Sequence, residues 1–430
     1  MALLEITEVS QAPPSEALLA SYLDSPAPGT ALERTTFEVG GWALGRHSEA
    51  ESVELVAGHE LIRAVPLWVE RPDVAAVHPG APAASGFWSL CGTLPLEREF
   101  RLEVRAVLAD GTRGVIGSIA GRREPIRTSF QPQLEPLLVT SLGRTGTTLL
   151  MSLLAAHPAV VAHRNYPYEI FPARYWLHAL RVLAEPADHT HSSHPSNFTE
   201  EIWRVGYNPF HTAPATHAPE LMDLFGRSYV ERLARFCQES IDDFYRTTAA
   251  LQEQPGAELF VEKFQPDALP RIARDLYPGM KEIVLVRDFR DLICSVFAFN
   301  EKRGTVDFGR DGFQSDAEYA RYVASRGRQL LDAWKSRRDR AELVRYEDLA
   351  TEPVATLKRI FAYLELEDDP AIVEKMTAAA FDHPDASGHR TTAGVDESIG
   401  RWKRDLPPAL RPVVGESLDP VLAELGYEPT

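Results

Sequence analysis

A glycine-containing turn between an apolar strand and an apolar helix is the feature that most constrains the fold of this chain. Residues Pro136–Leu154 read PLLVTSLGRTGTTLLMSLL. The segment opens on a continuous apolar run, as in a buried parallel strand, and closes with apolar residues at helical spacing. Backbone N–H groups of such a turn and of the first helical turn converge on an anion, whose charge the helix dipole favours. The segment therefore predicts an α/β domain with an anion-binding loop.

This loop departs from the P-loop of kinases and ATPases. Those enzymes need Gly-x-x-x-x-Gly-Lys-Ser/Thr, whereas Thr147 stands in the place of the lysine and Ser141 in that of the first glycine. The cationic group is Arg144, inside the loop. A P-loop kinase of a small molecule is therefore kept only as an alternative hypothesis, beside a glycine turn that binds no ligand.

Three further apolar segments predict the remaining strands of the same sheet. Residues 258–264, 282–288 and 341–349 read ELFVEKF, EIVLVRD and AELVRYEDL. Short apolar strands between helices are typical of parallel sheets, so we assign residues 129–430 to an α/β domain in which helices flank a P-loop-like parallel sheet. Residues 163–219 are aromatic and rich in His and Pro, which predicts a long insertion over the sheet.

The N-terminal part has the sequence pattern of an all-β domain. Short segments between Thr35 and Gly121 alternate in polarity and are separated by Gly, Pro and Asp-Gly turns, which predicts a small β-sandwich. The first 30 residues are rich in Ala, Pro and Ser and predict a short helix with an irregular lead-in. A polar, Pro-containing linker follows at 121–136. We assign residues 1–128 to this β-sandwich-like domain and its linker.

A second pattern pairs an arginine with a serine. Residues 282–295 read EIVLVRDFRDLICS, with Arg287 at the end of a strand and Ser295 eight residues later. Two helical turns separate the pair, so both side chains can face one point above the sheet edge. An arginine and a serine so placed can clamp a phosphate. The alternative is that Arg287 pairs with Asp291.

These two patterns resemble the sulfotransferases that use 3′-phosphoadenosine 5′-phosphosulfate (PAPS), most of all the bacterial and tyrosylprotein branches. Thr145 stands where many members have Ser. Residues 343–349 are similar to a later strand of the family, whose Tyr lies near the cofactor, and residues 398–403 to its C-terminal Gly-x-Trp-Lys/Arg segment. The resemblance spans about residues 136–427. It implies transfer of the sulfuryl group of PAPS to a hydroxyl of a saccharide, lipid or secondary metabolite, with PAP as product and without a metal.

The resemblance also implies the roles of individual residues. Arg144 would stabilise charge during an in-line displacement, in which positioning and electrostatics do most of the work. The residues expected to bind the cofactor are Gly143, Arg144, Thr145, Gly146, Thr147, Thr148, Arg287, Ser295, Tyr346, Arg401, Trp402 and Lys403.

The acceptor hydroxyl needs a general base. The cytosolic branch uses a histidine, and Phe264 occupies its position here. The tyrosylprotein branch uses a glutamate after the first helix, assisted by a lysine on the strand that contains Lys263 in this chain. A direct count puts Asn165 at that position, and Glu169 fits if the loop is four residues longer. We predict Glu169 as the base and Lys263 as its partner near the sulfonate, with His163 as the alternative base.

The composition of the chain limits the kinds of molecule it is expected to bind and the cell compartment in which it is expected to lie. Lys and Arg number 45 against 62 Asp and Glu, a net charge of -17 that argues against a nucleic-acid-binding surface but allows a local basic pocket. The three cysteines have no short spacing, the N-terminus does not read as a signal peptide, and no apolar run approaches the length of a membrane span. We therefore expect a cytoplasmic protein. The cluster 188–194 (DHTHSSH) fits no known zinc spacing.

A third hypothesis is a nucleotide-binding module with the sulfotransferase fold and no activity. Such a module would bind the nucleotide but lack a working base, so it stays open while the base is undecided between Glu169 and His163.

Overall fold

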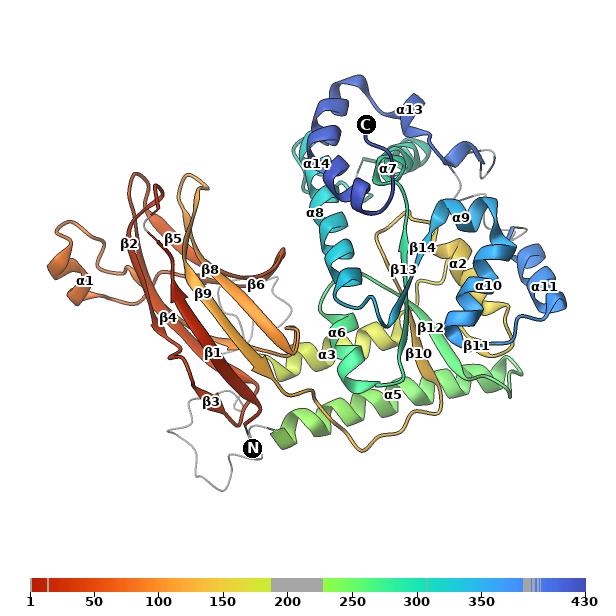
Figure 1. Cartoon of the computed structure of the whole chain (residues 1–430), viewed down its shortest axis with the longest axis horizontal. Helices are drawn as coiled ribbons and strands as arrows, with labels where there is room; N and C mark the ends of the chain where they lie inside the picture. The colour runs from red at the N-terminus through yellow and green to blue at the C-terminus, as the bar shows by residue number, and fades with distance from the viewer. Residues whose placement is uncertain are drawn as a thin grey trace. The chain divides into compact units, whose positions relative to one another are not determined.

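The computed structural model describes residues 2–13, 15–186, 227–306, 308–381, 388, 391–392, 394 and 396–430 (Figure 1). Within these ranges the chain forms two compact units. The first, here the β unit, is drawn from Met1–Phe130, Tyr175–Glu239 and Arg271–Leu276, and the second, the α/β unit, from Gln131–Arg174, Ser240–Pro270 and Tyr277–Thr430. The division of the chain at residues 128 and 129 stays a prediction.

The β unit contains two antiparallel sheets, as the alternating N-terminal segments predict. One sheet has the order β3-β1-β9-β8-β5-β6 and the other β2-β4-β7. Buried apolar side chains such as Phe37, Leu55 and Leu102 form one core cluster. The strands are β1 (Leu4–Gln11), β2 (Leu18–Ser25), β3 (Ala31–Leu32), β4 (Thr36–Gly45), β5 (Ala50–Ala57), β6 (Glu60–Pro66), β7 (Gly86–Gly92), β8 (Glu99–Leu108) and β9 (Arg113–Arg123).

The predicted helix within the first 30 residues is wrong, because both β1 and β2 are strands. In β1, Leu4 and Ile6 are buried two residues apart, which is the period of a strand and not of a helix. The β1 strand pairs with β9, and the Glu5 carboxylate lies 2.5 Å from the Arg122 guanidinium on that strand. Pairing with a strand about a hundred residues away thus determines the secondary structure of this segment, although its local composition suggests a helix.

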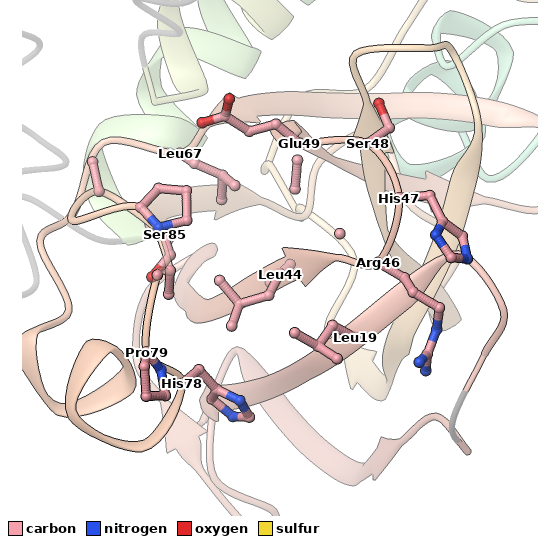
Figure 2. A pocket seen from close by; sticks show the side chains of 17 residues that line it. Leu19, Leu44, Arg46, His47, Ser48, Glu49, Leu67, His78, Pro79 and Ser85 are labelled. Carbon is pink, nitrogen blue, oxygen red and sulfur yellow. The ribbon is translucent and has the colours of Figure 1, made fainter.

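A hollow of about 360 Å³ lies in the β unit (Figure 2). Its lining includes the apolar side chains of Leu19, Leu44 and Leu67. The loop after α1 (Pro72–Val77) adds polar side chains, among them His78 and Ser85. The Ser85 hydroxyl is buried and has no hydrogen-bond partner among the described residues. No residue of this hollow is a predicted site residue.

The α/β unit contains the predicted parallel sheet, in the order β11-β12-β10-β13-β14. All four pairings are parallel. The strands therefore end at one edge of the sheet, where ligands of open α/β folds bind. They are β10 (Glu135–Ser141), β11 (Val160–Val161), β12 (Leu259–Phe264), β13 (Lys281–Val286) and β14 (Ala341–Arg345).

Helices cover both faces of this sheet, which explains why its strands read as apolar runs (Figure 1). One core cluster joins the sheet to α2 (Thr147–Ala155), α10 (Pro353–Leu364) and α11 (Pro370–Phe381). The other joins it to α7 (Phe289–Arg303), α8 (Asp316–Lys335) and α14 (Arg411–Glu424). The remaining helical segments are α3 (Pro172–Ala184), α5 (Tyr229–Leu251), α6 (Leu269–Leu276), α9 (Tyr346–Thr351), η5 (Asp396–Ser398), α13 (Trp402–Asp405) and η6 (Pro408–Leu410).

The position of Tyr346 and the predicted insertion differ in detail from the expectations. Tyr346 is the first residue of α9 and not part of the strand before it. The predicted insertion 163–219 includes α3 in its described part, whereas the histidine cluster 188–194 lies outside the described residues. Across the described ranges, no helix combines the length and hydrophobicity that crossing a membrane requires.

Candidate active site

The loop between β10 and α2 has a tightly constrained backbone. Gly146 precedes the helix with a φ of 90°, and a Cβ at this position would lie 2.3 Å from the Tyr346 ring. Arg144 also has a positive φ, 64°, which is uncommon for a residue with a side chain. Thr145 is fully buried, and its hydroxyl donates a 2.8 Å hydrogen bond to the Leu142 carbonyl. The Thr145 side chain therefore stabilises the loop, and a role in binding the cofactor stays a prediction for this residue.

A cavity of about 540 Å³ opens at this edge of the sheet. Its lining comes from the loop, the segment after β11, the end of β12, β13 with α7, the start of α9 and the C-terminal segment. Most of the predicted site residues line this one cavity: Gly143, Arg144, Gly146, Thr147, Thr148, Glu169, Lys263, Arg287, Ser295 and Tyr346.

The cavity is strongly cationic. Its described lining contains Arg144, Arg174, Lys263, Arg287 and Arg303, and Glu169 is the only carboxylate among those residues. The whole chain has a net charge of -17, so this concentration of positive charge is local. Charges of one sign in a cleft with low-dielectric walls focus the field and attract a ligand of the opposite sign. The cavity is therefore suited to a small polyanion.

Arg144 lies close to the serine predicted to clamp a phosphate. Its Nε donates to Ser295 Oγ at 3.3 Å, and its guanidinium carbon lies 4.5 Å from the centroid of the Phe299 ring. Burial, followed by the charges of Arg287 and Arg401, lowers the pKa of Arg144 to about 10. Arg144 is thus still cationic at neutral pH, and a bound anion would relieve the repulsion among these arginines.

Arg287 is fixed from several sides. Its Nη1 and Nη2 groups donate to the carbonyls of Arg144 and Ser398, at 3.1 and 2.6 Å. Its guanidinium carbon lies 4.5 Å from the centroid of the Tyr346 ring, and the Tyr346 and Ser398 hydroxyls are 2.8 Å apart. The Arg287 Nε is buried and has no hydrogen-bond partner among the described residues. A buried donor without a partner at a cavity wall fits a ligand that supplies the acceptor.

Arg287 and Asp291 form no ion pair among the described residues, although the Arg287 charge acts on the Asp291 carboxyl and opposes the rise in its pKa. The Asp291 carboxylate instead accepts from the backbone N–H groups of Gly400 and Trp402, at 2.7 and 2.8 Å. Burial raises the pKa of Asp291 to about 6. Asp291 therefore anchors the C-terminal segment and leaves the Arg287 guanidinium to the cavity.

Lys263 and Glu169 lie on the β12 side of the same cavity. Lys263 Nζ lies 3.3 Å from Thr148 Oγ1 and donates to the Pro167 carbonyl at 2.5 Å. Burial lowers the pKa of Lys263 to about 8, and the charge of Glu169 opposes this shift. Glu169 is exposed and forms no ion pair with Lys263, although both line the cavity. A carboxylate open to the cavity beside a buried cation is consistent with the predicted pair.

The other predicted base, His163, does not line the cavity. Its ring lies 5.8 Å from that of Phe244, between centroids, and its Nδ1 is buried without a hydrogen-bond partner among the described residues. The structure thus places Glu169, and not His163, in the described cavity wall.

Three predicted residues of the C-terminal segment also lie outside the lining. Arg401 Nε and Nη2 donate to Asp405, and its Nη1 donates to Thr391 Oγ1 at 2.9 Å. Trp402 belongs to a core cluster, and its ring lies 4.0 Å from the Arg290 guanidinium carbon. Lys403 is exposed. Their roles in binding a cofactor stay predictions.

A buried carboxylate that is absent from the predicted site residues organises the cavity wall. Glu262 accepts from the backbone N–H groups of Ala173 and Arg174 at 2.9 and 2.8 Å, and from the Tyr245 hydroxyl at 2.6 Å. Burial raises the pKa of Glu262 to about 7, against these hydrogen bonds. The available signal was a glutamate in the middle of an apolar strand, because such a residue is rarely buried without specific partners.

A metal site is not evident in the part of the chain that the structure describes. No group of three or more His, Cys, Asp or Glu side chains there lies close enough to hold an ion.

The chain is similar in sequence to known sulfotransferases. The sequence profile described as "Sulfotransferase family" matches residues 136–370. The human protein "Carbohydrate sulfotransferase 3" is 28% identical over 181 residues, which are 38% of this chain and 37% of that protein. The protein of the same name from Tetronarce californica is 27% identical over 198 residues, 42% of this chain and 44% of that protein. The chain thus aligns with less than half the length of these curated relatives.

Solved structures are also similar to this chain. The sulfotransferase domain from the curacin biosynthetic pathway is 15% identical with a TM-score of 0.42, and the match covers 70% of this chain and 100% of that one. Mouse sulfotransferase SULT7A1 complexed with PAP is 11% identical with a TM-score of 0.37, and the match covers 70% and 91%.

Proposed function

The chain belongs to the sulfotransferase family, and we propose that it transfers the sulfuryl group of PAPS to a hydroxyl of a saccharide. The observation that carries this proposal is the convergence of the loop, Arg287, Ser295, Lys263 and Glu169 on one cationic cavity. The saccharide is proposed because the curated relatives are named carbohydrate sulfotransferases. Lipids and secondary metabolites are the other acceptor classes consistent with the sequence.

The donor would bind with its two charged ends at different places in the cavity. The backbone N–H groups at the start of α2, with the hydroxyls of Thr147 and Thr148, would hold the 5′-phosphosulfate. Arg287 and Ser295 would hold the 3′-phosphate, for which the unpartnered Nε of Arg287 is a suitable donor. The loop and the Arg287–Ser295 pair would therefore supply the two anion-binding groups that PAPS requires.

The chain's own residues would then act on the transfer in distinct ways. The acceptor oxygen forms a bond to sulfur while the bond from sulfur to the 5′-phosphate oxygen breaks. Arg144 would stabilise negative charge on the oxygens around sulfur, and Lys263 would do so on the leaving side. Glu169 would accept the proton of the acceptor hydroxyl. No step requires a metal ion, since the charge is balanced by these side chains.

The kinase alternative gains no support from the site. Thr147 replaces the lysine that a kinase P-loop needs, and Arg287 with Ser295 offers an additional anion site beyond the loop. The inactive-module alternative is kept, because only an activity assay separates it from an enzyme. A cytoplasmic location also stays a prediction, which fractionation of the producing cell tests.

Two measurements test the proposed function. The first compares retention on PAP-agarose with retention on ATP-agarose, and we expect retention by PAP and elution by free PAP. The second follows PAPS consumption across saccharide, phenol and lipid acceptors, and we expect turnover with a saccharide. Retention by ATP alone would support the kinase reading, and PAP binding with no turnover on any acceptor would support an inactive module.

A further inference from the structure

The order of the strands separates the cavity into two sides. The loop follows the central strand β10, while Arg287, Ser295 and Tyr346 follow β13 and β14 on one side. Lys263 is the penultimate residue of β12 on the other side, where Glu169 from the segment after β11 also lines the cavity. If the nucleotide lies toward β13 and β14, the β12 side is left for the acceptor.

Arg174 lies on this β12 side, and its position is well defined. It is in the first turn of α3 and lines the cavity. Its backbone N–H and that of Ala173 are held by the buried Glu262 carboxylate, which is 2% exposed. The Tyr245 hydroxyl holds that carboxylate in turn, and the Tyr245 ring stacks on Phe260 with centroids 4.1 Å apart. Arg174 therefore projects from a rigid support.

The Arg174 guanidinium has no hydrogen-bond or ion-pair partner among the described residues. Its Nε is buried without a partner among the described residues, and its guanidinium carbon lies 4.7 Å from the centroid of the Phe171 ring. Its charge also acts on the Glu262 carboxyl and lowers the pKa of that group, against the effect of burial. Phe171 lines the cavity as well. A buried donor without a hydrogen-bond acceptor is unfavourable, whereas one at a cavity wall gains its acceptor when a ligand binds.

We propose that Arg174 binds a negatively charged group of the acceptor, so that the acceptor is an acidic saccharide bearing a carboxylate or a sulfate ester. The proposal rests on the proposed function, because it takes the β12 side as the acceptor side. Glu169, the only carboxylate in the described lining, lies on the same side and would face the hydroxyl. A neutral acceptor would cover the Arg174 Nε with a weak hydrogen-bond acceptor at best, whereas an acidic one would supply a charge-assisted hydrogen bond.

Binding to the PAP-loaded protein tests this directly, without need of turnover. Calorimetry would compare a hexuronate-containing oligosaccharide, its carboxamide derivative, a sulfated oligosaccharide and its desulfated counterpart. We expect the acidic member of at least one pair to bind roughly 10- to 100-fold more tightly than its neutral counterpart, the range for a hydrogen bond to a charged group. The two pairs separate a carboxylate from a sulfate ester.

Arg174→Gln should abolish that preference and leave binding of the neutral saccharide unchanged, and Arg174→Lys should restore part of it. Arg164→Gln is the matched control, because Arg164 is an exposed arginine of the preceding loop that does not line the cavity. An equal loss for acidic and neutral saccharides in Arg174→Gln would overturn the inference, as would a wild type that binds no acidic saccharide while it binds PAP. Failure to bind PAP at all would instead overturn the proposed function.

Discussion

Replacing Arg287 by glutamine is expected to weaken PAP binding through the 3′-phosphate alone. An arginine has five N–H donors, and two of them already serve the carbonyls of Arg144 and Ser398. The Nε–H and the remaining Nη–H groups are left for a phosphate, and the Nε has no partner among the described residues. A hydrogen bond to a charged group contributes ~1.5–3 kcal/mol, so we expect the Kd of PAP to rise roughly 10- to 100-fold.

The assay is a comparison of two nucleotides. Isothermal titration would measure PAP and AMP, which lacks the 3′-phosphate, with wild type, Arg287→Gln and Ser295→Ala. The Kd of AMP should be nearly unchanged in both variants, and Ser295→Ala should weaken PAP by less than Arg287→Gln, because it removes a neutral hydroxyl.

A specific result would refute the clamp. If Arg287→Gln weakened PAP and AMP by the same factor, its effect would come from the loop, through the carbonyl of Arg144, and not from the 3′-phosphate. Thermal unfolding of the same samples shows whether the variant is folded, so a general loss of structure is recognised separately.

Four further predictions concern the same cavity. Arg144→Ala should lower turnover by ~10²–10³ in a folded protein, as for loss of a single transition-state donor; an unchanged kcat would remove Arg144 from the mechanism. Glu169→Gln should bind PAP normally and lose ~10²–10⁴ in kcat, with His163→Ala far milder; the reverse order would transfer the role to the histidine. Lys263, with its pKa lowered to about 8, is cationic below that pH and neutral above it, so kcat/KM for PAPS should fall as pH rises through about 8, and Lys263→Arg should retain activity there. Gly146→Ala should destabilise the fold by ~1–3 kcal/mol in denaturant titration, because of its positive φ and its contact with Tyr346; unchanged stability would contradict the constrained loop.

The α/β unit was predictable because its signals are local. A strand that is covered on both faces has a continuous apolar sequence, and the loop between β10 and α2 is formed by consecutive residues of one motif. The strands β1 and β2 were not predictable in the same way. Their burial depends on partners far along the chain, and the alternating residues Leu4 and Ile6 are too few to outweigh a composition rich in Ala and Pro.

The site was predictable where a motif fixes the backbone and the direction of the side chain together. Arg287 and Ser295 both line the cavity because strand and helix geometry place them there. The segment 398–403 matches by residue type, yet Trp402 points into the core and Arg401 is held by Asp405. Glu262 and Arg174 depend on contacts between β12 and α3, which no local pattern records.

Arg144, Arg287 and Arg401 repel one another, and this repulsion bears on how the cavity would select an anion. Burial and the charges of Arg287 and Arg401 already lower the pKa of Arg144. Three of the cations are nevertheless held in place by neutral groups: carbonyls for Arg287, a hydroxyl for Arg144, and a hydroxyl with a carbonyl for Lys263. Neutral partners fix the geometry without cancelling the charge, so the favourable electrostatic energy is left for the ligand. The net charge of -17 repels an anion overall, whereas the cationic lining of this cavity attracts it. The affinity for PAP should therefore fall steeply with ionic strength, as expected for a focused field and not for a neutral pocket.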